Sequence, residues 1–191
     1  MTSGSHGSGG IVRGGSRTAS PAPSTTDVSL ADQMRAFRRR WASGLVVVTT
    51  ATEAGLRGVT VAAFMVVSLD PPLVAFCPTV EGEFGRLLTA SGRFGASILD
   101  RSAGHEVLAE RFAARGPLPD AAFTGIPHRV LPSGMPVLSG ALGWVAGEVI
   151  EATPAGDHLL VLGRVTATRV EPDTDDPLLS YEGAYRGLEP G

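Results

Sequence analysis

Two adjacent polar residues, Asp157 and His158, are the leading candidates for chemistry in this chain. An imidazole can gain or lose a proton near neutral pH, and a neighbouring carboxylate can fix its tautomer. Two further carboxylates, Glu81 and Glu83, are candidates for acid or base work. A histidine that opens a strand directly after a turn can also be purely structural, so the pair alone leaves both interpretations open.

The usual catalytic signatures are missing from the 191 residues. The sequence contains no HExxH, no Cys/His metal spacing, no GxSxG and no Walker loop. We therefore expect no metal site. We look instead to cofactor chemistry, in which the protein mainly binds and orients a group that reacts.

Charge and hydropathy exclude several kinds of partner. The formal net charge is −3 and the pI is about 5.8, which argues against a nucleic-acid-binding surface. No apolar stretch reaches the length of a membrane span, and residues 1–29 lack the hydrophobic core of a signal peptide. We therefore expect a cytoplasmic protein that binds neither nucleic acid nor a membrane.

The proportions of apolar and charged residues predict a large core and a covered surface. Hydrophobic residues make up 43% of the chain and charged residues only 18%. With so few charges for the outside, part of the apolar surface should be buried against a second copy, so we expect a homodimer.

The chain divides into a tail and one domain. Residues 1–27 are mostly Gly, Ser, Thr and Pro, and they cannot bury enough apolar surface to offset the entropy of ordering them. We predict a disordered tail over 1–27 and a single domain over 28–191.

The domain is predicted to be mainly β. Gly58–Leu73 contains a long apolar run that Asp70-Pro71-Pro72 ends, and a second apolar run, Leu73–Cys77, follows. Proline fixes φ and lacks a backbone donor, so we expect strand, tight turn and strand, with both strands covered on both faces. The expected strands are 45–50, 59–67, 73–77, 94–99, 141–152, 158–169 and 178–181. The first expected helix is capped by Asp27 or Ser29, has Met34, Phe37 and Trp41 at near-helical spacing, and stops at Ser43-Gly44. Two further helices are expected over 86–91 and 105–114. Short strands with few, peripheral helices predict an antiparallel split β-barrel.

Five segments, in order along the chain, resemble the signature of the flavin reductase-like family. The most specific is Gly58–Leu73, which reads Gly-x-Thr-x-x-x-Phe-x-x-Val-Ser-Leu-Asp-Pro-Pro-Leu. The others are Ala42-Ser43-Gly44, Ala90-Ser91-Gly92-Arg93-Phe94 with Arg111-Phe112-Ala113, Gly156-Asp157-His158 with the glycine and valine that follow, and Pro177–Arg186. The resemblance implies an FMN-binding split β-barrel of the kind that often serves two-component flavin monooxygenases.

The resemblance also implies a role for individual residues. Thr60, Val61 and Ala62 would line the flavin ring and ribityl chain, largely through backbone groups, and Ser68 would lie near the polar chain. Gly82 and Phe84 occupy the loop that presents Ser and Thr to the flavin phosphate in relatives. His158, with Asp157 beside it, would stand on the nicotinamide side, and Tyr185 and Arg186 would lie at the mouth of the site.

Two departures from the family pattern concern the flavin. Relatives commonly have Thr-Ala-Asn-Ser-Phe-x-Ser where this chain has Thr60-Val61-Ala62-Ala63-Phe64-Met65-Val66, and Ser-x-Thr where it has Gly82-Glu83-Phe84. Each lost hydrogen bond to a phosphate costs about 1.5–3 kcal/mol. We therefore expect FMN or FAD to be weakly held.

These observations favour an NAD(P)H-dependent flavin reductase. It would transfer a hydride from NADH or NADPH to FMN or FAD and could supply a monooxygenase component. The alternative is a barrel that has lost flavin redox chemistry, acting as a non-redox biosynthetic enzyme for a cyclisation or isomerisation, or as a small-molecule binding protein. Flavin absorbance in the purified protein discriminates between the two.

Overall fold

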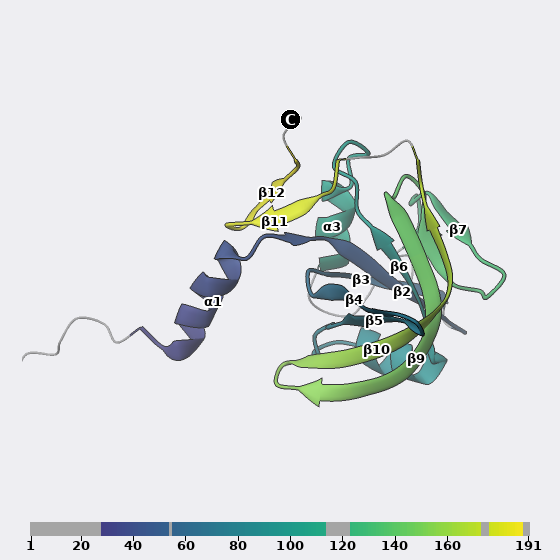
Figure 1. Cartoon of the computed structure of the whole chain (residues 1–191), viewed down its shortest axis with the longest axis horizontal. Coiled ribbons are helices and arrows are strands. Elements are labelled where there is room, and N and C mark those ends of the chain that lie inside the picture. Colours follow the sequence, from purple (N-terminus) through teal and green to yellow (C-terminus); the bar gives the residue numbers. More distant parts are fainter. Residues whose placement is uncertain (1–27, 54, 114–122, 173–175, 189–191) are drawn as a thin grey trace, which may run out of the picture.

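A seven-stranded antiparallel sheet forms the centre of the molecule (Figure 1). The computed structural model describes residues 28–53, 55–113, 123–172 and 176–188; the predicted tail, 1–27, lies outside them. The strand order is β3-β2-β6-β9-β10-β5-β4. These strands are β2 (Val46–Thr52), β3 (Gly55–Val61), β4 (Phe64–Leu69), β5 (Pro72–Phe76), β6 (Arg93–Ile98), β9 (Gly143–Ala155) and β10 (His158–Val170).

Two small sheets and three helices complete the described part of the chain. One small sheet has the order β1-β11-β12, and the other pairs β7 with β8. Their bounds are Ser43–Gly44 for β1, His128–Val130 for β7, Pro136–Leu138 for β8, Leu179–Tyr181 for β11 and Ala184–Arg186 for β12. The helices are α1 (Leu30–Arg40), α2 (Phe84–Ser91) and α3 (Glu106–Ala113). Within the ranges that the structure describes, no helix has the length and apolar character needed to cross a membrane.

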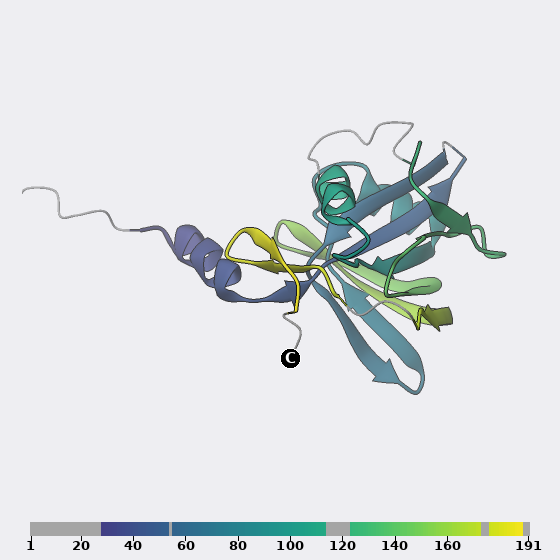
Figure 2. The same ribbon diagram turned by 90° about the horizontal axis from the view of Figure 1, so that it is seen from above.

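The sheet must curl because its two edge strands are consecutive in sequence. Only Ala62 and Ala63 separate β3 from β4, although these strands lie at opposite ends of the strand order. Three residue steps span at most about 11 Å, so the two edges meet at this point. Beyond it, the β4–β5 hairpin extends outward toward its turn (Figure 2), while β5 stays paired with β10. The result is a barrel that is open along one seam, as predicted.

The sequence prediction of one strand over 59–67 is wrong, since the chain leaves β3 at Val61 and enters β4 at Phe64. The expectation that β4 is covered on both faces is also wrong for the single chain. Four of its apolar side chains are between 51% and 86% exposed: Met65, Val66, Val67 and Leu69. The reason is that β4 is an edge strand beside the seam, which a local apolar pattern does not reveal.

Several other local predictions are confirmed with shifted ends. The predicted helix 86–91 begins two residues earlier, at Phe84, and the helix predicted over 105–114 is α3. Ser29, and not Asp27, caps α1, because its hydroxyl accepts a hydrogen bond from the Asp32 N–H at 3.1 Å. The short strands β7, β8 and β12 were not anticipated.

Side chains pack on both faces of β2. Val46 and Val48 point into the barrel, where Phe76 and Phe94 pack with ring centroids 5.3 Å apart. Val47 points the other way, into a cluster that includes Phe112 of α3. Alternate residues of a strand face opposite sides, so one β-branched run serves both clusters.

His105 is a buried polar group that joins the start of α3 to the loop after β8. It is 4% exposed, and its Nδ1 accepts the Asp100 N–H at 3.1 Å. The ring also hydrogen-bonds the Ser139 backbone. Burial lowers the pKa of His105, against smaller opposing effects of Asp100, Ser139 and Glu106. The neutral imidazole therefore acts as a fixed link between the two segments.

Gly163 of β10 has no side chain and so leaves room for the Phe94 ring inside the barrel. A Cβ at Gly163 would lie 2.4 Å from Phe94 Cε1, which no real contact allows. The register of β9 and β10 also shifts between Leu162 and Gly163. Glycine is needed here for space rather than for backbone conformation.

We predict that Gly163→Ala lowers the free energy of unfolding by about 1–3 kcal/mol, because the added methyl overpacks the barrel. Gly44→Ala is the matched control, since no atom lies within 4 Å of a Cβ built there. That change should alter stability by less than about 0.5 kcal/mol. Urea denaturation of both variants measures the difference, and equal stabilities would contradict the packing argument.

Candidate active site

The turn between β9 and β10 brings Asp157 and His158 against the segment that follows β5. Thr79 forms a β-bridge with His158, and the Leu159 N–H donates to the Pro78 carbonyl at 2.9 Å. The Val80 N–H donates to the Asp157 carbonyl at 3.0 Å. The predicted catalytic pair is therefore fixed to residues 78–80 by backbone hydrogen bonds rather than placed on a free loop.

The first turn of α2 packs against the same end of β10. A Cβ at Gly85 would lie 2.5 Å from Leu159 Cδ1, so a larger residue there would have to displace the end of the Leu159 side chain. The preceding loop contains Gly82, which is exposed and has a φ of +95°. This places the predicted phosphate loop beside His158, although the two are far apart in sequence.

The break between β3 and β4 reaches the same region. The Cys77 N–H donates to the Ala63 carbonyl at 3.0 Å, and both Ala62 and Ala63 are exposed. Cys77 is followed directly by Pro78 and Thr79, which bind β10. We call the group of Ala62, Ala63, Gly82, Asp157 and His158 the hairpin-tip site.

A hydrogen bond of 2.7 Å joins His158 Nδ1 to Asp157 Oδ1. An ionised carboxylate can only accept, so Nδ1 carries the proton and Nε2 is left to interact with a ligand. The hydrogen bond with His158, followed by the attraction of its charge, lowers the pKa of Asp157, whose side chain is 90% exposed. Asp157 thus stays ionised and fixes the imidazole.

The loop before α2 carries acids where a phosphate site needs donors. Glu81 and Glu83 are both exposed, and Glu83 occupies the N-cap position without a side-chain capping bond. Arg86 Nη2 lies 3.8 Å from Glu83 Oε1, which offsets one of the two charges. Two carboxylates and one guanidinium leave the loop with an excess negative charge.

Three predicted binding residues have side chains engaged elsewhere. Thr60 Oγ1 donates to the Ala109 carbonyl of α3 at 2.8 Å. Val61 and Phe84 are both at least 95% buried, in the barrel cluster. These three residues can offer a ligand only backbone groups, as the sequence analysis assumed for Thr60 and Val61. Phe84 keeps its place in the predicted phosphate loop, but its side chain packs in the barrel cluster.

Three other predicted residues lie apart from the hairpin tip within one chain. Ser68 pairs with Leu73 near the turn that ends β4. Tyr185 and Arg186 belong to β12, and Tyr185 packs on the cluster beside α3. Burial raises the pKa of Tyr185, with smaller contributions from the charges of Glu110 and Glu106. Figure 1 shows β12 separated from the β9–β10 turn.

Sequence reasoning missed Cys77 and Thr79 as members of this region. Nothing local marks Thr79, whose place follows from its pairing with His158 across 79 residues. Within the described ranges, no three His, Cys, Asp or Glu side chains gather as a metal site would require.

The site fits a flat ring better than it fits a phosphate. Ala62 and Ala63 are exposed, and their side chains end at Cβ, so a planar ring can approach the backbone there. The acidic loop opposes a phosphate. The fold and this region together define an antiparallel split barrel in which a hydrogen-bonded Asp–His pair lies near an exposed break of small residues.

Comparison with known proteins identifies the family. The family model described as "Flavin reductase like domain" matches residues 38–189. The HsaB reductase subunit of a flavin-dependent monooxygenase from Mycobacterium tuberculosis (strain ATCC 25618 / H37Rv) is 33% identical over 160 residues, covering 82% of this chain and 83% of HsaB. An NADH-dependent flavin reductase from Rhodococcus sp is 37% identical over 153 residues, covering 78% and 82%. This chain belongs to the flavin reductase-like family.

A solved structure supports the same conclusion. The NADH:FAD oxidoreductase SgcE6 of Streptomyces globisporus C-1027 has a TM-score of 0.77 and 30% identity, covering 89% of this chain and 100% of that one. Three expectations are confirmed: the split barrel, the activity of an NAD(P)H:flavin oxidoreductase, and flavin and nicotinamide as its cofactors. The non-redox alternative is not favoured.

Proposed function

We propose that this flavin reductase reacts at the hairpin-tip site and supplies reduced flavin to a separate monooxygenase component in the cytoplasm. The observation that carries the site is the series of backbone contacts that links the exposed Ala62–Ala63 break, through Cys77 and residues 78–80, to the Asp157–His158 pair. The relative HsaB, named as the reductase subunit of a flavin-dependent monooxygenase, supports the choice of partner.

Each part of the site has a physical task. A flavin held at this site would supply the acceptor for the hydride of a reduced nicotinamide. Ala62 and Ala63 offer backbone groups and small side chains to the ring. His158, oriented through its Nδ1 by Asp157, offers Nε2 as a hydrogen-bonding group to the nicotinamide carboxamide or pyrophosphate. The chain's contribution is thus to bind and orient rather than to form a bond.

The direct test is oxidation of NADH or NADPH with added FMN or FAD under anaerobic conditions. Reduced nicotinamide should disappear only when flavin is present, with bleaching of the flavin absorbance. A second step adds a monooxygenase component and its substrate in air, where product should depend on the reductase. Absence of flavin reduction with every pair of substrates would reject the proposal.

We predict that His158→Ala slows flavin reduction by roughly threefold to tenfold, the effect of one hydrogen bond. Flavin affinity should stay within about twofold, because the imidazole serves the nicotinamide. His158→Gln, which retains a hydrogen-bonding amide, should recover part of the rate. Anaerobic stopped-flow measures the rate, and fluorescence titration measures flavin binding. Equal losses of rate and affinity would place His158 on the flavin or in the fold.

We predict that the protein purifies with little flavin and that removing the acids of the loop improves FMN binding. Replacing Glu81 and Glu83 by Gln should tighten FMN by roughly twofold to fivefold at low ionic strength, and salt should erase the gain. Riboflavin, which lacks the phosphate, is the control, and its affinity should not change. Tight FMN binding by the wild type, or equal gains for riboflavin, would contradict this role of the acids.

We also propose a homodimer, because large apolar surfaces are uncovered in the single chain. Helix α1 buries none of its residues and exposes Met34 and Phe37, with Trp41 exposed directly after it. It projects from the body of the molecule in both views (Figures 1 and 2). The exposed apolar edge strand β4 is a second such surface. A second copy would cover both.

Sedimentation tests the dimer. At micromolar concentration the protein should sediment at twice its 19.7 kDa chain mass. Val66→Lys, a charge on the β4 edge, should weaken association at least about tenfold. Val107→Lys, on the exposed face of α3, should leave it unchanged. A monomeric wild type would refute the proposal.

A further inference from the structure

Helix α1 and the β4–β5 hairpin extend outward from the body of the single chain, in different directions (Figures 1 and 2). Both carry large apolar side chains that are more than half exposed. On α1 and directly after it these are Leu30, Met34, Phe37 and Trp41, and on β4 they are Met65, Val66, Val67 and Leu69. Spacings of four and three residues place the first group along one stripe of the helix. Neither element covers the other within one chain.

Glu182 holds the last turn of α1. It lies in the turn between β11 and β12, with a φ of +52°. Its N–H donates to the Arg39 carbonyl at 2.8 Å, and its carbonyl accepts from Arg39 Nη2 at 2.8 Å. Its Oε1 lies 3.0 Å from Arg40 Nη1. Three contacts therefore set the direction of α1, although none of the helix is buried.

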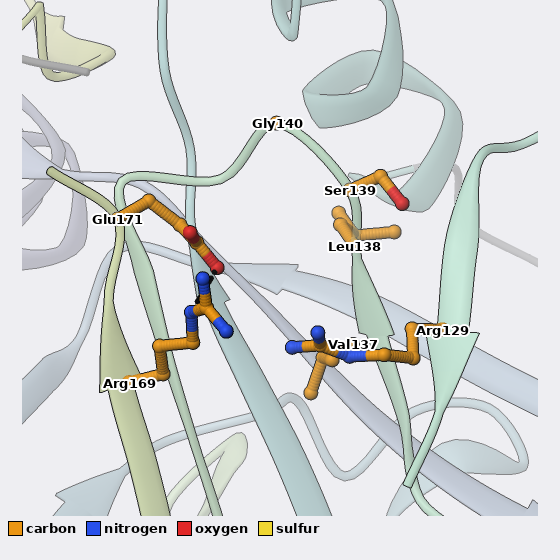
Figure 3. Close-up of a pocket in the computed structure, with 7 residues that line it drawn as sticks. All are labelled: Arg129, Val137, Leu138, Ser139, Gly140, Arg169 and Glu171. Carbon is orange, nitrogen blue, oxygen red and sulfur yellow. Dashed lines mark ion pairs between the residues drawn. The ribbon is translucent and has the colours of Figure 1, made fainter. Parts of the chain in front are cut away.

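The depression that the structure describes lies away from both apolar elements. It is found between β7, β8 and the end of β10, and three of its lining side chains are charged: Arg129, Arg169 and Glu171 (Figure 3). Its lining includes none of the exposed apolar residues of α1 or β4. Those residues lie on outward elements instead. Apolar surface of this kind marks contact with a macromolecule or a membrane rather than a site for a small molecule.

A second copy of the chain supplies a surface for both elements at once. In a two-fold dimer, a contact between α1 and the partner's β4 is repeated with the roles exchanged. Each contact would bury the eight apolar side chains named above. Burial of one such side chain removes roughly 60–120 Å², so the two contacts together remove on the order of 1,000 Å². That area reaches the size of a specific interface.

Other occupants fit α1 less well. Residues 1–27 contain only three large apolar side chains, Met1, Ile11 and Val12, to set against the four of α1. An anionic membrane would need free arginines on the helix. Arg39 and Arg40 are instead held by Glu182. Both alternatives also leave β4 exposed.

We propose that α1 is an exchanged arm, which Glu182 holds in place and whose apolar stripe lies on the β4–β5 hairpin of a second copy. The arm of that copy lies in the same way on this chain. The inference rests on the proposed homodimer and states which surfaces form it. A monomeric wild type would refute the homodimer itself, whereas a dimer built on other surfaces would refute only the exchanged arm.

Photo-crosslinking of the full-length protein tests the arrangement. Phe37→benzoylphenylalanine should crosslink on irradiation to a peptide that contains residues 64–69. Mass spectrometry of dimers formed from isotope-labelled and unlabelled chains should show that the link joins two chains. The same probe at Val107, exposed on α3, is the control and should give no link to that peptide. Links from position 37 to α1 or to residues 1–27, links within one chain, or a dimer without the link would overturn the proposal.

Three variants measure the contribution of the arm by analytical ultracentrifugation. Phe37→Ser should raise the dissociation constant of the dimer by roughly tenfold or more, since it removes a buried ring. Arg39→Ala with Arg40→Ala, which releases the arm from Glu182, should raise it by roughly threefold to tenfold. Arg35→Ala is the matched control, because Arg35 pairs only within α1, and it should stay within about twofold.

Vesicles of phosphatidylserine and phosphatidylcholine provide the membrane arm of the test. Neither the wild type nor Phe37→Ser should sediment with them. Unchanged dimerisation of Phe37→Ser, with circular dichroism showing that it folds, would reject the exchanged arm. Vesicle binding by the wild type that Phe37→Ser abolishes would reject it in favour of a membrane contact.

Discussion

The two-residue connection between β3 and β4 is the constraint on which the rest of the structure depends. Because Ala62 and Ala63 join the two edges of a seven-stranded sheet, the sheet cannot stay open and flat. Curling creates an interior that must be filled. Phe76 and Phe94 fill it, and Gly147 and Gly163 leave the space that the Phe94 ring occupies.

The same connection creates both the binding region and the exposed surface. Where the edges meet, Ala62 and Ala63 are exposed, and Ala63 is hydrogen-bonded to Cys77. Residues 78–80, which follow Cys77, are in turn hydrogen-bonded to the segment that contains Asp157 and His158. Where the edges part, β4 is left as an apolar edge strand. A single chain can leave such an edge exposed only if another surface covers it. The candidate site and the proposed dimer surface both lie along this one opened seam.

The long β9–β10 hairpin distributes charge between two distant regions. Its turn carries Asp157 and His158 next to an acidic loop, and its far end carries Arg169 opposite Arg129. Glu81 and Glu83 make that loop acidic, with Arg86 beside Glu83. Near the far end of the hairpin, Arg169 is paired with Glu171. The two ends of one hairpin therefore carry different charged groups.

Sequence alone determined the family, the mainly β class and the pairing of Asp157 with His158, because these depend on local order and adjacent residues. It placed most strands and helices within a few residues, since apolar periodicity is a local property. Only the tertiary structure decided that 59–67 is two strands, that Phe84 packs inside the barrel, and that Arg129 lies over Trp144. Each of these depends on which distant segment lies alongside, and strand pairing across the sheet is not encoded in the pattern of either partner alone.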